Sequence, residues 1–185
     1  MFNIAPFSSE DIWVGQLAEA LALRCGSDPA TASLIGKAAA LHDVGKSRVP
    51  FHILSKPDDL TLDEFRIIKT HTFWGGNVLL RLQGDFGVMA RNVCIWHHER
   101  YDKSGYWGKS TDELPAYVHM VALCDVYVAL TSPNRPYKRA WSHNQALGHV
   151  ESKSGKQFCP KLAKTFLALM VDNPALQEFT FGEVA

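Results

Sequence analysis

Apolar side chains recur every three or four residues along most of the chain, which is the spacing of amphipathic helices. A first helix is predicted from a capping serine at position 8 or 9 to Cys25, and Gly26 ends it. A second helix starts at Asp28-Pro29, with proline in its first position, and runs to Gly45. No segment alternates polar and apolar residues over the length of a strand. The pattern therefore predicts an all-α fold.

Five further helices complete this prediction. Thr61 and Glu64 form a capping box that opens the third helix, in which Gly75-Gly76 indicates a bend or a close approach of another element. The others are predicted over residues 85–98, 115–130 and 142–152, and from Pro160 onward. We therefore expect a helical bundle of about seven helices that forms a single domain over residues 1–185.

Two long polar segments separate these helices. The first is ERYDKSGYWGKSTDELPA, at residues 99–116, and the second is TSPNRPYKRAW, at residues 131–141. Loops of this length inside a compact domain are usually functional. We therefore expect both loops to border the functional site.

Composition is that of a soluble globular protein, with 46% hydrophobic and 21% charged residues. The formal net charge is zero, so the chain has no general attraction for nucleic acid polymers or membranes. No run of roughly 18 apolar residues occurs, so no membrane span is expected. The start of the chain also lacks the basic and apolar regions of a secretory signal.

The four cysteines, Cys25, Cys94, Cys124 and Cys159, form no CxxC pair. Three of them lie in apolar helical segments, so we interpret the cysteines as buried free thiols rather than disulfides. Free thiols favour a reducing, cytoplasmic location.

Four separate predicted helices carry residues of the types that bind metal ions. These residues are His42, Asp43, His71, His97, His98 and Asp125. His42 or His71 alone is more typical of a satisfied core residue, and His97-His98 alone of ordinary surface residues, but the joint pattern favours a metal centre. Adjacent helical residues point about 100° apart, so His42 can serve one ion while Asp43 bridges two. Asp125 lies in an apolar helix, where a carboxylate needs a partner, either a metal ion or a cation such as Arg100 or Lys46.

The segments LHDVGK, KTHTFWGGNVL, HHERYDKSGYW and CDVYVALTSPNRPYKRA together resemble the HD-GYP family, a branch of the HD phosphohydrolase superfamily. The resemblance extends from about Leu17 to Leu169. It implies a helical bundle of the HD-domain type that binds divalent metal ions. It also implies hydrolysis of the bacterial second messenger cyclic di-GMP.

The resemblance further implies how the ligands divide between two ions. The first ion would be held by His42, Asp43 and Asp125. The second would share Asp43 and add His71, His97 and His98. Imidazoles and carboxylates without a thiolate suit iron, manganese, nickel, cobalt or zinc, so the residue types leave the metal open.

The substrate residues follow from the same resemblance. Lys46 would contact phosphate, and Arg135 and Lys138 match basic positions that bind the nucleotide. Tyr106 lies in the loop after which the family is named. A metal-bridging hydroxide would attack phosphorus, which makes Asp43 and Lys46 the expected catalytic residues.

The chain departs from the family pattern in its named loop, which usually reads Asp-Gly-x-Gly-Tyr-Pro. Here a glycine is replaced by Lys103, at a position where a left-handed backbone would be strained. The proline is replaced by Trp107, which adds a large stacking surface. A usual aspartate is replaced by Val128, and Cys159 stands where aspartate is common.

The first helix lacks the histidine that the family often places there. Spacing puts that position on Glu10, and either Glu10 or Asp11 can offer a substitute oxygen ligand. Both acids also fit a simpler role near a helix N-terminus, where the helix dipole favours negative charge. A third metal ion is not expected, because its usual carboxylate position is Pro6.

Three hypotheses follow for function. The first is a metal-dependent phosphodiesterase for cyclic di-GMP. The second is a degenerate domain that binds metal, nucleotide or a GGDEF-type protein partner, with Trp107 as a candidate anchor, and turns over little or no substrate. The third is an HD phosphohydrolase for another nucleotide. Exposed apolar faces leave room for a homodimer.

Overall fold

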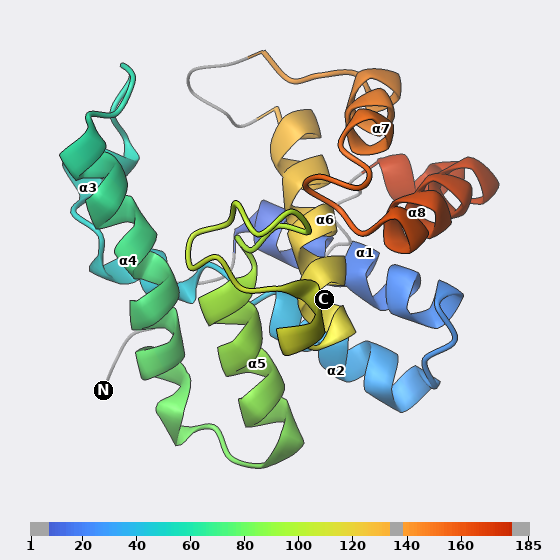
Figure 1. Cartoon of the computed structure of the whole chain (residues 1–185), viewed down its shortest axis with the longest axis horizontal. Coiled ribbons are helices and arrows are strands. Elements are labelled where there is room, and N and C mark those ends of the chain that lie inside the picture. The colour runs from blue at the N-terminus through green and yellow to red at the C-terminus, as the bar shows by residue number, and fades with distance from the viewer. Residues whose placement is uncertain (1–7, 134–138, 179–185) are drawn as a thin grey trace, which may run out of the picture.

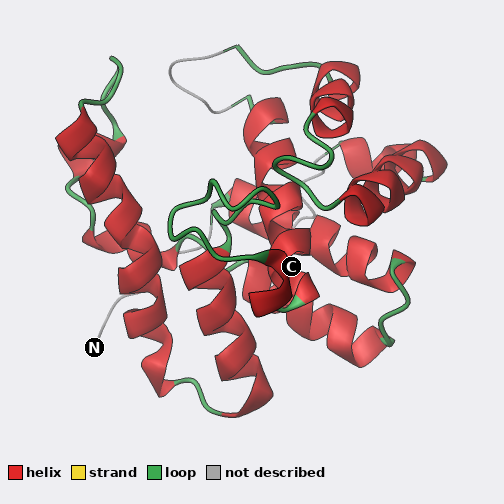
Figure 2. Cartoon of the chain, viewed as in Figure 1, coloured by secondary structure: helices red, strands yellow, loops and turns green. Residues whose placement is uncertain are grey.

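The computed structural model describes residues 8–133 and 139–178, and every regular element in these ranges is helical (Figure 2). The α-helices are α1 Ser9–Arg24, α2 Pro29–Ala39, α3 Phe51–Leu54, α4 Leu62–Val78, α5 Gly84–Trp96, α6 Ala116–Thr131, α7 His143–Ser152 and α8 Pro160–Asp172. Short 3-10 segments are η1 Val44–Arg48, η2 Leu79–Arg81, η3 Thr111–Glu113 and η4 Pro174–Gln177. The all-α prediction is confirmed, and the seven longer helices are those expected. The extra one, α3, is a four-residue helix in a stretch without helical periodicity.

Helix α6 forms the centre of the bundle. It runs through the middle of the molecule, with α1 beside it and with α5, α7 and α8 also packed against it (Figure 1). Nearly all of its side chains from Val118 to Val128 are buried, so this helix is apolar on all sides. Asp125 is therefore placed in the interior by the helix that anchors the core.

Helix starts follow the capping signals in the sequence. Ser8 caps α1 and Thr61 caps α4, each in a reciprocal capping box with an acid three residues later. The box of α4 was predicted. In the box of α1 the acid is Asp11, whose Oδ2 accepts a hydrogen bond from the Ser8 N–H at 2.9 Å.

Helix α2 ends at Ala39, six residues earlier than predicted, because the chain then turns to lie on α4. The contact is backbone to backbone: a Cβ on Gly45 would lie 1.9 Å from the His71 carbonyl oxygen. Helix α4 runs without a break through Gly75-Gly76. Of the two predicted readings, the glycine pair is therefore explained by close packing, since a Cβ on Gly76 would lie 2.8 Å from the Ile95 side chain.

No helix in the ranges that the structure describes is long and apolar enough to cross a membrane. All four cysteines are free, as predicted. Their expected burial holds for Cys94 and Cys124, whereas Cys159 is half-buried. Cys25 is exposed, because it follows the last turn of α1 rather than lying within its apolar face.

Candidate metal centre

Three buried histidines direct the same ring nitrogen, Nε2, towards the carboxylate of Asp43. His42 follows α2, His71 lies in α4, and His97 follows the last turn of α5. In each, Nδ1 lies next to a backbone carbonyl three or four residues earlier, at 2.8, 2.6 and 3.0 Å respectively. A carbonyl only accepts hydrogen bonds, so each Nδ1 carries the proton. When the ring is neutral, Nε2 then has a lone pair, which is the state of a metal ligand.

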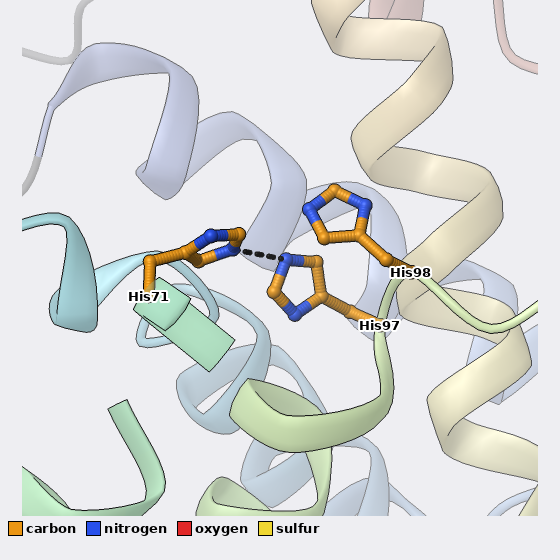
Figure 3. Close-up of side chains that lie close together, drawn as sticks. All are labelled: His71, His97 and His98. Atoms are coloured by element: carbon orange, nitrogen blue, oxygen red, sulfur yellow. Dashed lines mark hydrogen bonds between the residues drawn. The ribbon is translucent and has the colours of Figure 1, made fainter. Parts of the chain in front are cut away.

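The lone pairs of two of these histidines face each other. The Nε2 atoms of His71 and His97 are 3.3 Å apart (Figure 3). The ring of His98 joins them, with its centroid 4.0 Å from that of His97 and 5.2 Å from that of His71. One nitrogen from each of the three rings can lie within 4.8 Å of the other two. Lone pairs so close repel each other, and a bound cation would remove that repulsion.

Asp43 lies between the histidines and offers an oxygen to each side. Its Oδ1 is 3.3 Å from His71 Nε2 and 3.8 Å from His97 Nε2, and its Oδ2 is 3.1 Å from His42 Nε2. Lys46 also pairs with Oδ2. The Oδ1 atom is buried and has no hydrogen-bond partner. An orphaned carboxylate oxygen facing lone pairs is costly unless a cation lies there.

Asp125 reaches the centre from α6. Its Oδ1 lies 3.5 Å from Nε2 of His42. The alternative partners from the sequence pair elsewhere, since Lys46 pairs with Asp43 and Arg100 pairs within its own loop. Asp125 therefore belongs to the same group as His42 and Asp43.

Burial decides the protonation of three of the imidazoles. It holds the pKa of His97 well below its usual value and lowers the pKa of His71. It also lowers the pKa of His98 to about 4. All three rings are therefore neutral at pH 7, as metal ligands must be.

His42 differs from the other three. Burial lowers its pKa, but the carboxylates of Asp43 and Asp125 outweigh burial and hold this pKa well above its usual value. The pKa values of both carboxyls are lowered in turn: burial raises them, and the charge and hydrogen bonding of His42 more than offset it. Two carboxylates thus share one proton on His42, and a cation bound there would displace it.

Of the two acids on the first helix, Asp11 is the one that groups with two of the proposed ligands. Asp11, His42 and Asp43 can offer ligand atoms that all lie within 4.8 Å of one another. Oε1 of Glu10 instead accepts a hydrogen bond from the Ser132 hydroxyl at 2.7 Å. Both acids line a cavity of about 240 Å³, which the proposed ligands of the first ion, Lys46 and Val128 also line. Spacing alone favoured Glu10, because the direction of each side chain depends on the capping box.

Tyr106 lies against the histidine group. Its ring centroid is 4.4 Å from that of His98, and the Lys69 ammonium lies 4.7 Å from the Tyr106 centroid. Glu99 holds the loop of residues 99–116 in place, because its buried carboxylate accepts the backbone N–H groups of Trp107 and Lys109, both at 2.7 Å. Sequence reasoning assigned no role to Glu99 or Lys69. The signal available was an acid directly after two ligand histidines.

The departures from the family loop have visible consequences. Lys103 has φ +64°, so the left-handed position expected for a glycine is retained by a lysine. Trp107 is 53% exposed and meets Trp96 edge to face at 6.3 Å. Arg135 and Lys138, the predicted nucleotide-binding pair, lie outside the described residues.

Comparison with known proteins places this geometry in a family. The model of the HD domain family matches residues 4–162. The "Cyclic di-GMP phosphodiesterase" of Thermotoga maritima is 38% identical over 84% of this chain, and the match covers 42% of that protein. The "3'3'-cGAMP-specific phosphodiesterase 2" of Vibrio cholerae is 34% identical over 80% of this chain, and the match covers 28% of that protein. The chain therefore spans less than half the length of these relatives.

A solved structure has the same fold. Bd1817, an HDG"Y"P protein from Bdellovibrio bacteriovorus, matches with a TM-score of 0.71 at 16% identity, over 90% of this chain and 53% of that chain. The fold, the arrangement of histidines and aspartates and the match over residues 4–162 agree. The chain belongs to the HD domain family, as its resemblance to the HD-GYP branch implied.

Proposed function

We propose that this chain is a metal-dependent phosphodiesterase that hydrolyses cyclic di-GMP. The observation that carries the proposal is the buried, unpartnered Oδ1 of Asp43, which lies among imidazole nitrogens that have no proton to donate. Relatives named for hydrolysis of cyclic dinucleotides support the choice of substrate.

The residues fit two divalent ions that share Asp43. The proposed ligands are His42, Asp43, His71, His97, His98 and Asp125. Asp11 and Glu10, which line the same cavity as His42, are the candidates for a further oxygen ligand. With no thiolate among these residues, iron, manganese, nickel, cobalt and zinc all suit the site.

When bound, the ions would supply Lewis acidity at the phosphate and make a bound water acidic enough to react near neutral pH. Lys46 stands beside Asp43 with its side chain 46% exposed, so its ammonium can contact a phosphate oxygen. Burial, with the charges of Asp43 and Asp125, raises the pKa of Tyr106 to about 12. The Tyr106 phenol therefore stays protonated and can donate a hydrogen bond to the substrate.

Other expectations stay predictions. Arg135 and Lys138 are proposed to bind the nucleotide. We likewise expect a GGDEF-type partner for the Tyr106 loop, a homodimer, a cytoplasmic location and a single domain over residues 1–185.

The first test replaces the shared ligand. Asp43→Asn removes a charge that both ions need, so metal content should fall below one ion per chain. Hydrolysis of cyclic di-GMP should drop by more than about a hundredfold. Metal content is measured by elemental analysis after reconstitution, and product by chromatography. Asp63→Asn is the matched control, because Asp63 is an exposed carboxylate paired with Arg66 on α4.

Two outcomes would contradict the proposal. Wild-type protein that holds less than one metal ion per chain after reconstitution would exclude the shared site. Hydrolysis retained by Asp43→Asn would place the chemistry elsewhere.

A second candidate is a domain that binds metal or nucleotide without turnover. The left-handed Lys103 and the exposed Trp107 favour it, because both alter the loop beside the histidine group. Wild-type protein that holds metal and binds cyclic di-GMP but forms no product would support this candidate. Turnover of 3'3'-cGAMP in preference to cyclic di-GMP would instead support the third hypothesis, another nucleotide substrate.

A further inference from the structure

Lys69 reaches the edge of the candidate metal centre from α4, two residues before His71. Its ammonium lies between two aromatic rings, 5.3 Å from the centroid of Phe65 and 4.7 Å from that of Tyr106. The Tyr106 ring in turn stacks at 4.4 Å on His98. A positive charge is thus held one ring away from the histidine group shown in Figure 3.

This charge has no carboxylate partner within the described parts of the chain. Nearby lysines differ in this respect: Lys46 pairs with Asp43, and Lys56 pairs with Glu64. The Lys69 side chain is half-buried, and its ammonium lies over the face of the Phe65 ring. Cation–π contacts orient an ammonium but do not neutralise it. The Lys69 ammonium is therefore placed to bind an anionic group of a ligand.

The two lysines lie beside different groups of residues. Lys46 lines the cavity that His42, Asp125 and residues of α1 also line. Lys69 instead lies beside Tyr106, on the side where the rings of His71, His98 and Tyr106 meet. A substrate with a single phosphate, bound at the metals, would contact Lys46 and leave Lys69 without an anion to bind.

A cyclic dinucleotide carries two phosphodiesters in one covalent ring, and only one of them is cleaved at a time. The uncleaved phosphodiester is fixed close to the reacting one by the ring, and it needs a cation of its own. We propose that Lys69 binds this second phosphodiester and thereby selects cyclic dinucleotides over substrates with one phosphate. The inference rests on the proposed function.

The test compares two substrates. Cyclic di-GMP has two phosphodiesters, whereas bis(p-nitrophenyl) phosphate has one. Lys69→Met keeps the length of the stem and removes the charge. We expect KM for cyclic di-GMP to rise about tenfold with little change in kcat, because a charge-assisted contact to substrate is lost. Hydrolysis of bis(p-nitrophenyl) phosphate and metal content should stay at wild-type values.

Two further variants sharpen the test. Lys69→Arg keeps the charge and the contact with Tyr106, so it should retain most of the affinity for cyclic di-GMP. Lys164→Met removes an exposed lysine on α8, a helix without proposed ligands. It should leave the hydrolysis of both substrates unchanged. Direct binding of cyclic di-GMP to the metal-loaded protein, measured by calorimetry, should show the same order of variants.

Several results would overturn the inference. An equal loss on both substrates would mean that Lys69 only supports Tyr106 or the metal ligands. No change on either substrate would leave Lys69 without a role in binding. Failure of the proposed function is a separate result: there the wild-type protein itself would neither bind nor hydrolyse cyclic di-GMP, whatever its action on bis(p-nitrophenyl) phosphate.

Discussion

At the scale of one residue, Lys103 occupies a left-handed backbone position where the family pattern has glycine. Its φ of +64° is left-handed, a conformation that costs a residue with a Cβ about 1–2 kcal/mol. Lys103→Gly should remove that strain. Part of this gain in stability is lost, because glycine makes the unfolded chain more flexible. The expected net result is a stabilisation of about 0.5–1 kcal/mol, measured by urea unfolding of the metal-free protein.

Lys156→Gly is the matched control for this variant. Lys156 is also an exposed lysine in a turn, but its φ is not positive. Glycine there removes no strain, so this variant should be neutral or slightly destabilising. Equal effects from both substitutions would show that the left-handed backbone at Lys103 stores no strain.

Residue types revealed much of the candidate centre, whereas side-chain directions did not. His71, His97 and Asp43 are of the types that bind metals, and the structure brings them together. Asp11 was left as an alternative to Glu10 and Lys69 was missed, because their positions depend on a capping box and on a loop that folds back onto α4. Neither arrangement has a periodic signature in the sequence.

At the scale of elements, the contact between η1 and α4 places one ligand against another. A Cβ on Gly45 would lie 1.9 Å from the His71 carbonyl oxygen and 2.4 Å from the Gly75 nitrogen. Gly45→Ala therefore forces two backbones apart. We expect a loss of about 2–3 kcal/mol or more in the free energy of unfolding, measured by urea unfolding. Metal affinity should fall as well, because Asp43 directly precedes η1 and His71 lies on α4.

Gly148→Ala is the matched control, and we expect it to increase the free energy of unfolding. Gly148 is an exposed glycine within α7, and a Cβ there would meet nothing within 4 Å. Alanine should stabilise this helix by about 0.5–1 kcal/mol. If Gly45→Ala were as well tolerated as Gly148→Ala, the close approach of η1 to α4 would be excluded.

The same contact explains where the predicted elements were wrong. Helical periodicity continues past Ala39, and no local signal shows that the chain must turn to lie on α4. Helix starts were predicted well because caps are local, as at Thr61 and Ser142. Ends that depend on packing between distant segments were not.

For the whole molecule, the all-α class followed from periodicity, because burial of one helix face repeats every 3.6 residues. Which helices would meet did not follow from it. Helix α6 is apolar on all sides, which favours a central position but does not name its neighbours. The family resemblance supplied that arrangement by implying which residues share a metal.

The candidate centre also predicts how the molecule responds to acid. Burial lowers the pKa of His98 to about 4. As the pH falls, His98 therefore takes up a proton near pH 6.5 in the unfolded chain but only near pH 4 in the folded protein. Stability from His98 is therefore present above about pH 6.5 and lost as the pH falls towards 4. His71 and His97 act in the same direction, because burial lowers their pKa values too. His42 acts in the opposite direction, since its raised pKa adds stability at low pH that is lost as the pH rises through the folded value.

Between about pH 6.5 and 4 His42 is protonated in both the folded and the unfolded chain, so the three imidazoles with lowered pKa values make the Tm of metal-free protein fall, as followed by circular dichroism. Metal-loaded protein should start from a higher Tm and lose more over the same range, because protonated imidazoles release the ions. His98→Gln should reduce the fall in the metal-free protein, since glutamine does not titrate. A Tm of metal-free protein that rises over this range would contradict the lowered pKa values of the three buried imidazoles. A metal-dependent gain in Tm that stays constant down to pH 4 would be incompatible with imidazole ligands, because a cation held by histidines competes with protons at every one of them.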